Sequence, residues 1–113
     1  MKQGDIVLVP FPHADSDESE LHPAVVIAEV PFGNSSDIIL SMISSNIPKC
    51  TSDDVLINND DPEFPVTKLK YSSCVKTAKI ATISNNRIRH QLGRLGPNKN
   101  QEFTQKLKKR LAL

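Results

Sequence analysis

The chain has few cysteines and aromatic residues and no long apolar run. Its 113 residues include two cysteines, no tryptophan, one tyrosine and four phenylalanines. Cys50 and Cys74 are far apart, form no Cys-x-x-Cys motif and have no histidine at metal-ligand spacing. We therefore expect no metal site, a reducing compartment and no need for a disulfide. No stretch approaches the roughly 18 to 20 apolar residues that a membrane span requires, so we expect no membrane association.

The N-terminal sequence also lacks the apolar segment of a signal peptide. A charge at Lys2 and a glycine at Gly4 stand where that segment would lie, which predicts a cytoplasmic protein. The length suits one domain over residues 1–113, whose folding would remove roughly 65% of the extended-chain surface from water.

Charge is balanced overall but divided along the chain. Residues 1–61 carry two lysines against eleven acids, whereas residues 62–113 carry twelve bases against two acids. This division could place a basic face toward a nucleic acid or an acidic partner. The alternative is that the halves interleave in the fold and much of the field cancels.

Short apolar runs separated by turn residues predict a mainly β fold. The continuous run from Ile6 predicts a first strand that is buried on both sides and ends near Phe11. Further strands are predicted at 24–28, 38–44, 54–57 and 79–83, with a weaker alternation at 68–76. About five to seven short strands at this spacing are typical of a small, strongly curved barrel. The phenylalanines Phe11, Phe32 and Phe103 are predicted to lie in the core.

The C-terminal segment changes to a helical period. Phe103, Leu107 and Leu111 fall four residues apart, which predicts an amphipathic helix with Asn98 as its N-cap and Gln101 at the capping-box position. A shorter helix is predicted over 84–89, with Ser84 as its N-cap.

Four segments, in this order, resemble the MazF/PemK (Kid-like) toxin family of type II toxin–antitoxin systems. They are Gly4-Asp5-Ile6-Val7-Leu8-Val9, His22-Pro23-Ala24-Val25-Val26-Ile27, Met42-Ile43-Ser44-Ser45, and the run from Val75 to Ile83 followed by Ile88 and Leu92-Gly93-Arg94-Leu95. The resemblance extends over almost the whole chain. It implies an SH3-like β-barrel with a C-terminal helix, usually a homodimer that a small antitoxin protein blocks.

The same resemblance implies a metal-independent endoribonuclease that needs no cofactor and cuts single-stranded RNA. The RNA 2′-hydroxyl attacks its adjacent phosphate, leaving a cyclic phosphate and a free 5′-hydroxyl. Such a reaction needs a base, an acid and a group that stabilises phosphate charge.

The family's functional positions are only partly kept. The arginine that usually precedes the proline opening the second strand is His22 here, while Ser44 keeps the hydroxyl at the end of the third strand. Where the Kid-like branch has an arginine and, two residues later, an aspartate, this chain has Lys76 and Ala78. Lysine keeps the positive charge without the bidentate fork, and alanine removes the carboxylate.

We therefore predict catalytic roles for three residues. An imidazole can act as base or acid near neutral pH, which makes His22 a candidate for proton transfer. Ser44 would hold phosphate and Lys76 would stabilise developing charge. Each has an ordinary alternative: a histidine bonded to backbone at a strand entry, a serine satisfying a turn, and a solvated strand lysine.

A wider set is predicted to contact RNA, consisting of His13, Ser45, Thr77 and Lys79. His13 lies in an acidic segment over residues 13–20 whose carboxylates would repel RNA, so an exposed loop histidine without a role is the alternative there. Aromatic residues are few, so recognition is expected to rely on backbone amides and polar loops.

Two functional hypotheses follow from the resemblance and its departures. The first is an active endoribonuclease toxin in which His22 replaces the usual arginine. The second is a catalytically weak or silent barrel that binds a protein. A gyrase-directed toxin on the same barrel is a minor third possibility, because a fold alone does not decide its target.

Overall fold

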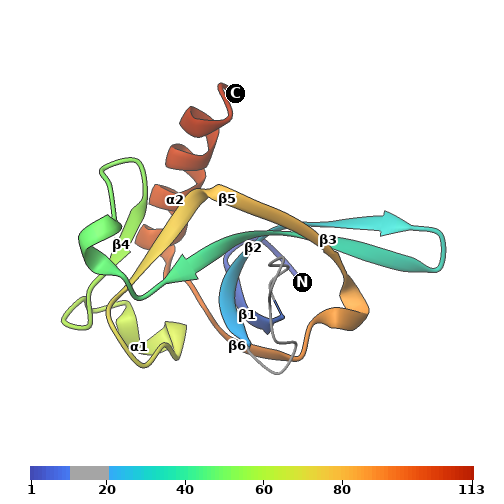
Figure 1. The fold of residues 1–113 in the computed structure, drawn as a ribbon, viewed down its shortest axis with the longest axis horizontal. Helices are drawn as coiled ribbons and strands as arrows, with labels where there is room; N and C mark the ends of the chain where they lie inside the picture. Colours follow the sequence, from blue (N-terminus) through green and yellow to red (C-terminus); the bar gives the residue numbers. More distant parts are fainter. Residues whose placement is uncertain (11–20) are drawn as a thin grey trace.

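The computed structural model describes residues 1–10 and 21–113, which form a six-stranded antiparallel sheet and a C-terminal helix (Figure 1). The strand order is β4-β5-β3-β2-β1-β6. The elements are β1 (Asp5–Val9), β2 (His22–Phe32), β3 (Ser35–Ser44), β4 (Val55–Ile57), α1 (Phe64–Thr67), β5 (Ser73–Ser84), β6 (His90–Arg94) and α2 (Pro97–Arg110). The predicted mainly β fold with a C-terminal helix is confirmed.

The sheet has an apolar cluster on each of its faces. Ile6 of β1 belongs to a cluster that α2 covers with Phe103 and Leu107, and Val7 belongs to a second cluster with Ile38 of β3. Successive residues of a strand point to opposite faces, so burial of neighbouring apolar residues requires cover on both sides. The prediction that the first strand is buried on both sides is confirmed for its described residues.

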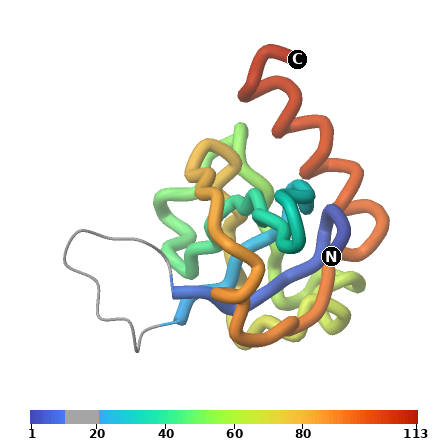
Figure 2. Tube along the Cα trace, turned by 90° about the vertical axis from the view of Figure 1, so that its right-hand side faces the viewer, coloured from blue at the N-terminus to red at the C-terminus, as the bar shows by residue number. Residues whose placement is uncertain are grey.

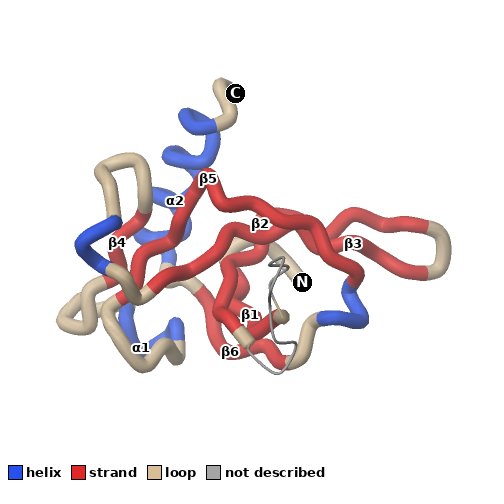
Figure 3. The backbone as a smooth tube through the Cα atoms, in the orientation of Figure 1, coloured by secondary structure: helices blue, strands red, loops and turns tan. Residues whose placement is uncertain are grey.

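β2 and β3 form a long hairpin whose outer half projects from the rest of the chain (Figures 1 and 3). The turn contains Gly33 at a φ of +61°, a conformation that glycine adopts without strain. Phe32 ends β2 beside this turn and is 73% exposed, so the prediction that it lies in the core is wrong. An apolar side chain favours burial, but Phe32 lies at the outer end of the hairpin, where none of the described core residues surrounds it. Phe103 is fully buried as predicted, and Phe11 lies outside the described residues.

β5 is one strand of twelve residues, where the sequence predicted a strand at 79–83 and only a weak alternation before it. Its pairing with β3 changes register between Ser41 and Met42, so Ile80 pairs with Ser41 while Lys76 pairs with Met42. This irregularity shifts the alternation of side chains between the sheet faces. A period-two pattern therefore does not run through the whole strand.

The N-terminus of α2 is capped by a residue from elsewhere in the chain. The predicted Asn98 cap is wrong, because the helix starts with Gly96 at the N-cap position and Pro97 after it, and no side chain of the cap residue bonds the helix. The Glu63 carboxylate accepts hydrogen bonds from the backbone amides of Asn98 and Lys99, at 3.0 and 2.9 Å. A carboxylate also suits the positive end of the helix dipole. The C-terminal turns of α2 extend beyond the rest of the chain (Figure 2).

A disulfide joins Cys50 to Cys74, with their Cα atoms 5.8 Å apart. The sequence predicted a reducing compartment and no need for a disulfide, so this bond departs from that expectation. Spacing in the sequence could not reveal the pair, because the two cysteines are 24 positions apart and meet only through the path of the chain between β3 and β5.

Two further predictions concern local elements. The segment predicted as a short helix over 84–89 is a 3₁₀ turn at Asn85–Arg87, with Ser84 at the N-cap position but without a side-chain cap bond. None of the helices in the described part of the chain has the length and apolar content of a bilayer span.

Candidate functional site

A groove of about 620 Å³ lies between the start of β2, the end of β3 and the segment that connects α1 to β5. This volume is within the range of roughly 300–1,000 Å³ that is typical of ligand clefts. Its apolar wall includes Leu8, Met42 and Leu92, from three different strands. The polar side chains on it are His22, Ser44, Ser45, Lys68, Lys70, Tyr71, Ser73 and Lys79.

Sheet register brings two of the predicted catalytic residues together. β2 and β3 are antiparallel, and Ala24 pairs with Met42. Continuing this register by two residues places His22 level with Ser44 on the same face, at the open ends of both strands. Both residues line the groove and are half-buried.

The Ser44 hydroxyl accepts a hydrogen bond within its own turn, and its hydrogen remains available to donate to a ligand. The backbone amide of Asn46 donates a hydrogen bond of 3.1 Å to Ser44 Oγ. The oxygen therefore acts as an acceptor there, and a hydroxyl has one donor hydrogen besides its lone pairs. This arrangement orients the hydroxyl and leaves its O–H group able to donate a hydrogen bond, for example to a phosphate oxygen.

The groove carries positive charge without a compensating carboxylate among the described residues that line it. Lys68, Lys70 and Lys79 contribute their ammonium groups, and no aspartate or glutamate is present in this lining. Elsewhere the two halves of the chain neutralise each other, as in the pairs of Lys99 with Asp61 at 3.5 Å and Arg110 with Asp54 at 3.7 Å. The two halves of the chain therefore interleave and cancel at these pairs, while the described lining of the groove keeps an excess of lysines.

Lys76 does not belong to the groove lining, although it lies opposite Met42 in the β3–β5 ladder. Its ammonium donates to Asp54 Oδ2 at 2.8 Å and to the Lys49 carbonyl at 2.9 Å. Burial opposes ionisation of the Asp54 carboxyl and acts to raise its pKa, but hydrogen bonds from Lys76 and Thr51 and the lysine charge outweigh burial. The pKa of Asp54 consequently falls from 3.8 to about 2. Lys76 thus serves a buried ion pair in this structure.

The other predicted RNA contacts are distributed unequally. Ser45 and Lys79 line the groove with His22 and Ser44. Thr77 is fully buried, donates to the Asp53 carbonyl at 2.9 Å and accepts from Arg110 Nε at 3.1 Å. His13 lies outside the described residues.

Sequence reasoning did not identify the segment Lys68–Tyr71 as part of the site. The structure places Lys68, Lys70 and Tyr71 on the groove, joined by the partly buried Leu69. The available signal was a tyrosine beside two lysines, a combination typical of surfaces that bind single-stranded nucleic acid. Only the fold shows that this segment faces His22.

One group of possible metal ligands occurs among the described residues. The sulfurs of Cys50 and Cys74 and a carboxylate oxygen of Asp54 lie within 4.8 Å of one another. The sulfurs are bonded to each other and the carboxylate holds Lys76, so these donor atoms already have partners.

The chain matches, over residues 2–111, the family model described as "PemK-like, MazF-like toxin of type II toxin-antitoxin system". No curated protein matches it. Similar solved structures include the Mycobacterium tuberculosis toxin MazF-mt6, with 12% identity, a TM-score of 0.71 and coverage of 96% of this chain and 97% of that one. A mycobacterial endoribonuclease in complex with its cognate antitoxin has 13% identity, a TM-score of 0.72 and coverage of 100% and 96%. MazF from Deinococcus radiodurans has 19% identity, a TM-score of 0.71 and coverage of 100% and 97%.

Proposed function

The chain belongs to the PemK-like, MazF-like toxin family of type II toxin–antitoxin systems, and we propose that it is an endoribonuclease that cuts single-stranded RNA in the groove of His22 and Ser44. The observation that carries this proposal is the combination of an imidazole, an oriented hydroxyl and three lysines in one groove whose described lining has no carboxylate. That combination suits a phosphodiester substrate.

The proposed reaction needs no metal. The 2′-oxygen of RNA bonds to the adjacent phosphorus while the bond from phosphorus to the 5′-oxygen breaks, giving a 2′,3′-cyclic phosphate and a 5′-hydroxyl. One proton leaves the 2′-hydroxyl and one reaches the departing 5′-oxygen. His22 carries out one of these proton transfers, because it is the imidazole on the groove among the described residues, and solvent water carries out the other.

The phosphate is held by hydroxyl and ammonium groups. Ser44 and Ser45 donate hydrogen bonds to the phosphate oxygens, and each bond to a charged group contributes about 1.5–3 kcal/mol where water is excluded. Lys79 takes the role of charge stabilisation that the sequence assigned to Lys76, since Lys79 lines the groove while the Lys76 ammonium is bound to Asp54.

A test is to incubate the protein with a long single-stranded RNA in the presence of a chelator and to map the new ends by primer extension. We expect cuts with 5′-hydroxyl ends and a hundredfold to ten-thousandfold lower rate for His22→Ala, about the range for a lost acid–base group. His90→Ala is the matched control, because His90 is exposed on β6 and does not line the groove. An unchanged rate for His22→Ala would remove the assignment of His22.

Ser44→Ala isolates the phosphate contact. We expect about a tenfold to hundredfold lower rate, which corresponds to one hydrogen bond to a charged group. Ser52→Ala, in an exposed turn before β4, should leave the rate unchanged.

The alternative function is a barrel that binds a protein without cutting RNA. Two observations favour it: the Lys76 ammonium forms an ion pair with Asp54, and position 78 is an alanine, which has no carboxylate. Tight binding of an antitoxin-like peptide with no RNA cleavage at any protein concentration would support it. Clean cleavage of a defined RNA would reject it.

The proposal includes partners and a location. A cognate antitoxin protein would block the groove, and the chain would act as a homodimer in the cytoplasm. Sedimentation of the purified protein tests the dimer, and co-purification with the product of a neighbouring gene tests the antitoxin.

A further inference from the structure

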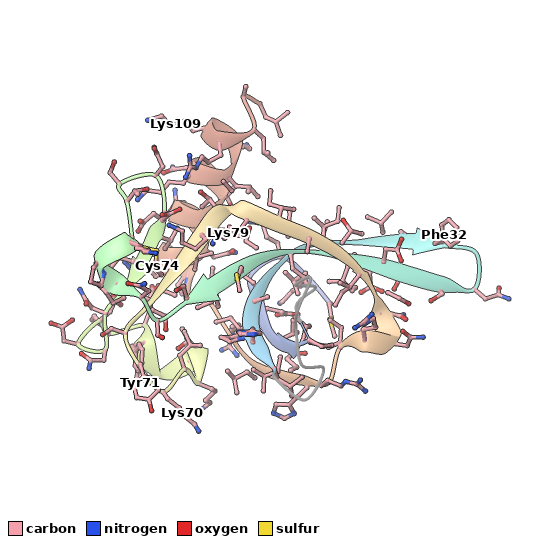
Figure 4. All side chains as sticks on the ribbon, viewed as in Figure 1. Phe32, Lys70, Tyr71, Cys74, Lys79 and Lys109 are labelled. Atoms are coloured by element: carbon pink, nitrogen blue, oxygen red, sulfur yellow. A yellow bond between two sulfur atoms is a disulfide. The ribbon has the colours of Figure 1, made fainter. Side chains whose placement is uncertain are left out.

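Tyr71 presents an exposed aromatic ring at the edge of the groove. The residue is 68% exposed and lines the groove together with Lys70 and Ser73. Lys70 and Tyr71 project from the same end of the molecule, whereas Phe32, which is also strongly exposed, lies at the tip of the hairpin on the other side (Figure 4).

The backbone on both sides of Tyr71 is tethered. Ser73 Oγ donates to the Tyr71 carbonyl at 2.8 Å, and the backbone amide of Asn59 donates to Ser72 Oγ at 2.9 Å. Before the tyrosine, the Leu69 side chain packs against the core cluster under α2. The ring therefore projects from a fixed segment, which lowers the entropic cost of binding a ligand against it.

The start of the segment is fixed by a local hydrogen bond and by close packing against β6. The Leu69 amide donates to Thr67 Oγ1 at 3.2 Å, and Lys68 adopts a left-handed conformation with φ of 60°. Gly93 of β6 approaches so closely that an added Cβ would lie 2.5 Å from the Thr67 carbonyl oxygen. The position of the segment relative to β6 is thus fixed by backbone packing.

The surroundings of the ring select the chemistry of its ligand. Lys68 and Lys70 precede Tyr71 in this segment, Lys79 lies on the same groove, and no carboxylate lines the groove among the described residues. A ligand that combines a flat ring with neighbouring negative charges fits this arrangement, and an unpaired nucleotide has both. Stacking of one base on an aromatic side chain contributes about 1–3 kcal/mol and tolerates different bases.

We propose that Tyr71 is a stacking platform for an unpaired base of the RNA, next to the phosphate that Ser44 and Ser45 hold beside His22. Lys70 contacts the phosphate that follows this base. This inference rests on the proposed function, because the nucleotide belongs to the substrate RNA. It adds a binding subsite for a base that takes no part in the reaction.

The composition of the chain provides a direct spectroscopic test. Tyr71 is its one tyrosine and there is no tryptophan, so the intrinsic tyrosine fluorescence reports on this residue. The protein is titrated with a short 2′-O-methyl RNA, which cannot be cut, and with an abasic oligomer that has the same number of phosphates. We expect the RNA to quench the emission after correction for absorption, and the abasic oligomer to leave it unchanged.

Variants measure the contribution to affinity. Tyr71→Ala should weaken binding of the labelled 2′-O-methyl RNA about fivefold to hundredfold, and Tyr71→Phe should keep most of the affinity because it keeps the ring. Phe32→Ala is the matched control and should bind as the unchanged protein does, since it removes a similarly exposed ring away from the groove.

The outcomes separate this inference from the proposed function. If the protein cuts RNA while Tyr71→Ala binds normally and the emission is unchanged, the platform is rejected and the ribonuclease stands. Equal quenching by the abasic oligomer would also reject stacking. Quenching without cleavage would support the platform and reject catalysis, and failure of all oligonucleotides to bind would reject both.

Discussion

The ammonium of Lys76 lies 2.8 Å from a carboxylate oxygen of Asp54, whose side chain is fully buried. The same carboxylate accepts hydrogen bonds of 3.1 Å from both the amide and the hydroxyl of Thr51. Arg110 of α2 lies 3.7 Å from its other oxygen. This one acid therefore connects β5, the turn before β4 and the C-terminal helix, and it explains why Lys76 is not available to the groove in this structure.

Removing the Asp54 charge should destabilise the fold. Asp54→Asn replaces the charged acceptor of the Lys76 ammonium by a neutral one and leaves it the Lys49 carbonyl, so the loss should be about 2 kcal/mol, the value that corresponds to the lowered pKa of Asp54. Urea unfolding at neutral pH measures the loss. Asp60→Asn, in an exposed turn, is the control and should change the free energy of unfolding by less than about 0.5 kcal/mol. Equal stability of both variants would contradict a structural role for the pair.

The same carboxylate should make stability depend on acid pH. The pKa of Asp54 is lowered from 3.8 to about 2 in the fold, so the folded state favours the ionised form. This contributes about 2 kcal/mol above pH 4 or so, and the contribution is lost as the pH falls through about 2. Unfolding free energies of the unchanged protein and Asp54→Asn should therefore converge on acidification. A constant difference across that range would show that Asp54 titrates normally.

Loss of the Cys50–Cys74 bond should lower stability without abolishing the fold. The bond closes a loop with a sequence separation of 24, and a cross-link of this length stabilises by roughly 3 kcal/mol through restriction of the unfolded chain. Cys50→Ser should unfold at correspondingly lower urea concentration. A reductant should then destabilise the unchanged protein but not the variant. Disulfides are rare in the cytosol, so thiol labelling of the protein taken directly from cells would also test the predicted location.

The Glu63 cap of α2 should contribute measurably to stability. Glu63→Gln removes the negative charge at the helix N-terminus but keeps an oxygen acceptor, whereas Glu63→Ala removes both. We expect the free energy of unfolding to fall by a few tenths of a kcal/mol for Glu63→Gln and by about 1–2 kcal/mol for Glu63→Ala. Thermal unfolding measures both losses. Glu102→Ala, on the same helix but away from its N-terminus, is the comparison. A smaller effect for Glu63→Ala than for Glu102→Ala would reject the capping role.

Groove lysines should determine the salt dependence of RNA binding. Lys79→Gln should weaken binding similarly for all RNA sequences and reduce the slope of log affinity against log salt by about 0.7, the value for one phosphate contact on a single strand. Lys108→Gln alters an exposed position of α2 outside the groove and should leave the slope unchanged. Affinity is measured by fluorescence anisotropy of a labelled, uncleavable RNA at several salt concentrations. Identical slopes for both variants would place the phosphate elsewhere.

The strands and the C-terminal helix could be predicted because their signals are local. A continuous apolar run gave the doubly buried β1, and residues four apart gave the helix face of Phe103 and Leu107. The apolar patterns also placed His22 just before the second strand and Ser44 at the end of the third, but it was the resemblance to the toxin family that made them site candidates, and the β2–β3 pairing that brought them together. Its neighbours were not, because Tyr71 and its lysines reach the groove only through the packing of α1 and Leu69 on the sheet.

What the sequence by itself determined is the mainly β class and the C-terminal helix, while the resemblance to the toxin family singled out His22 and Ser44. What only the tertiary structure decided is which residue meets which partner. Lys76 binds Asp54 across 22 positions, Glu63 caps a helix 35 positions away, and Cys50 bonds Cys74 across 24. Such contacts depend on how loops return to the sheet, and no short-range pattern of apolar and polar residues encodes that return.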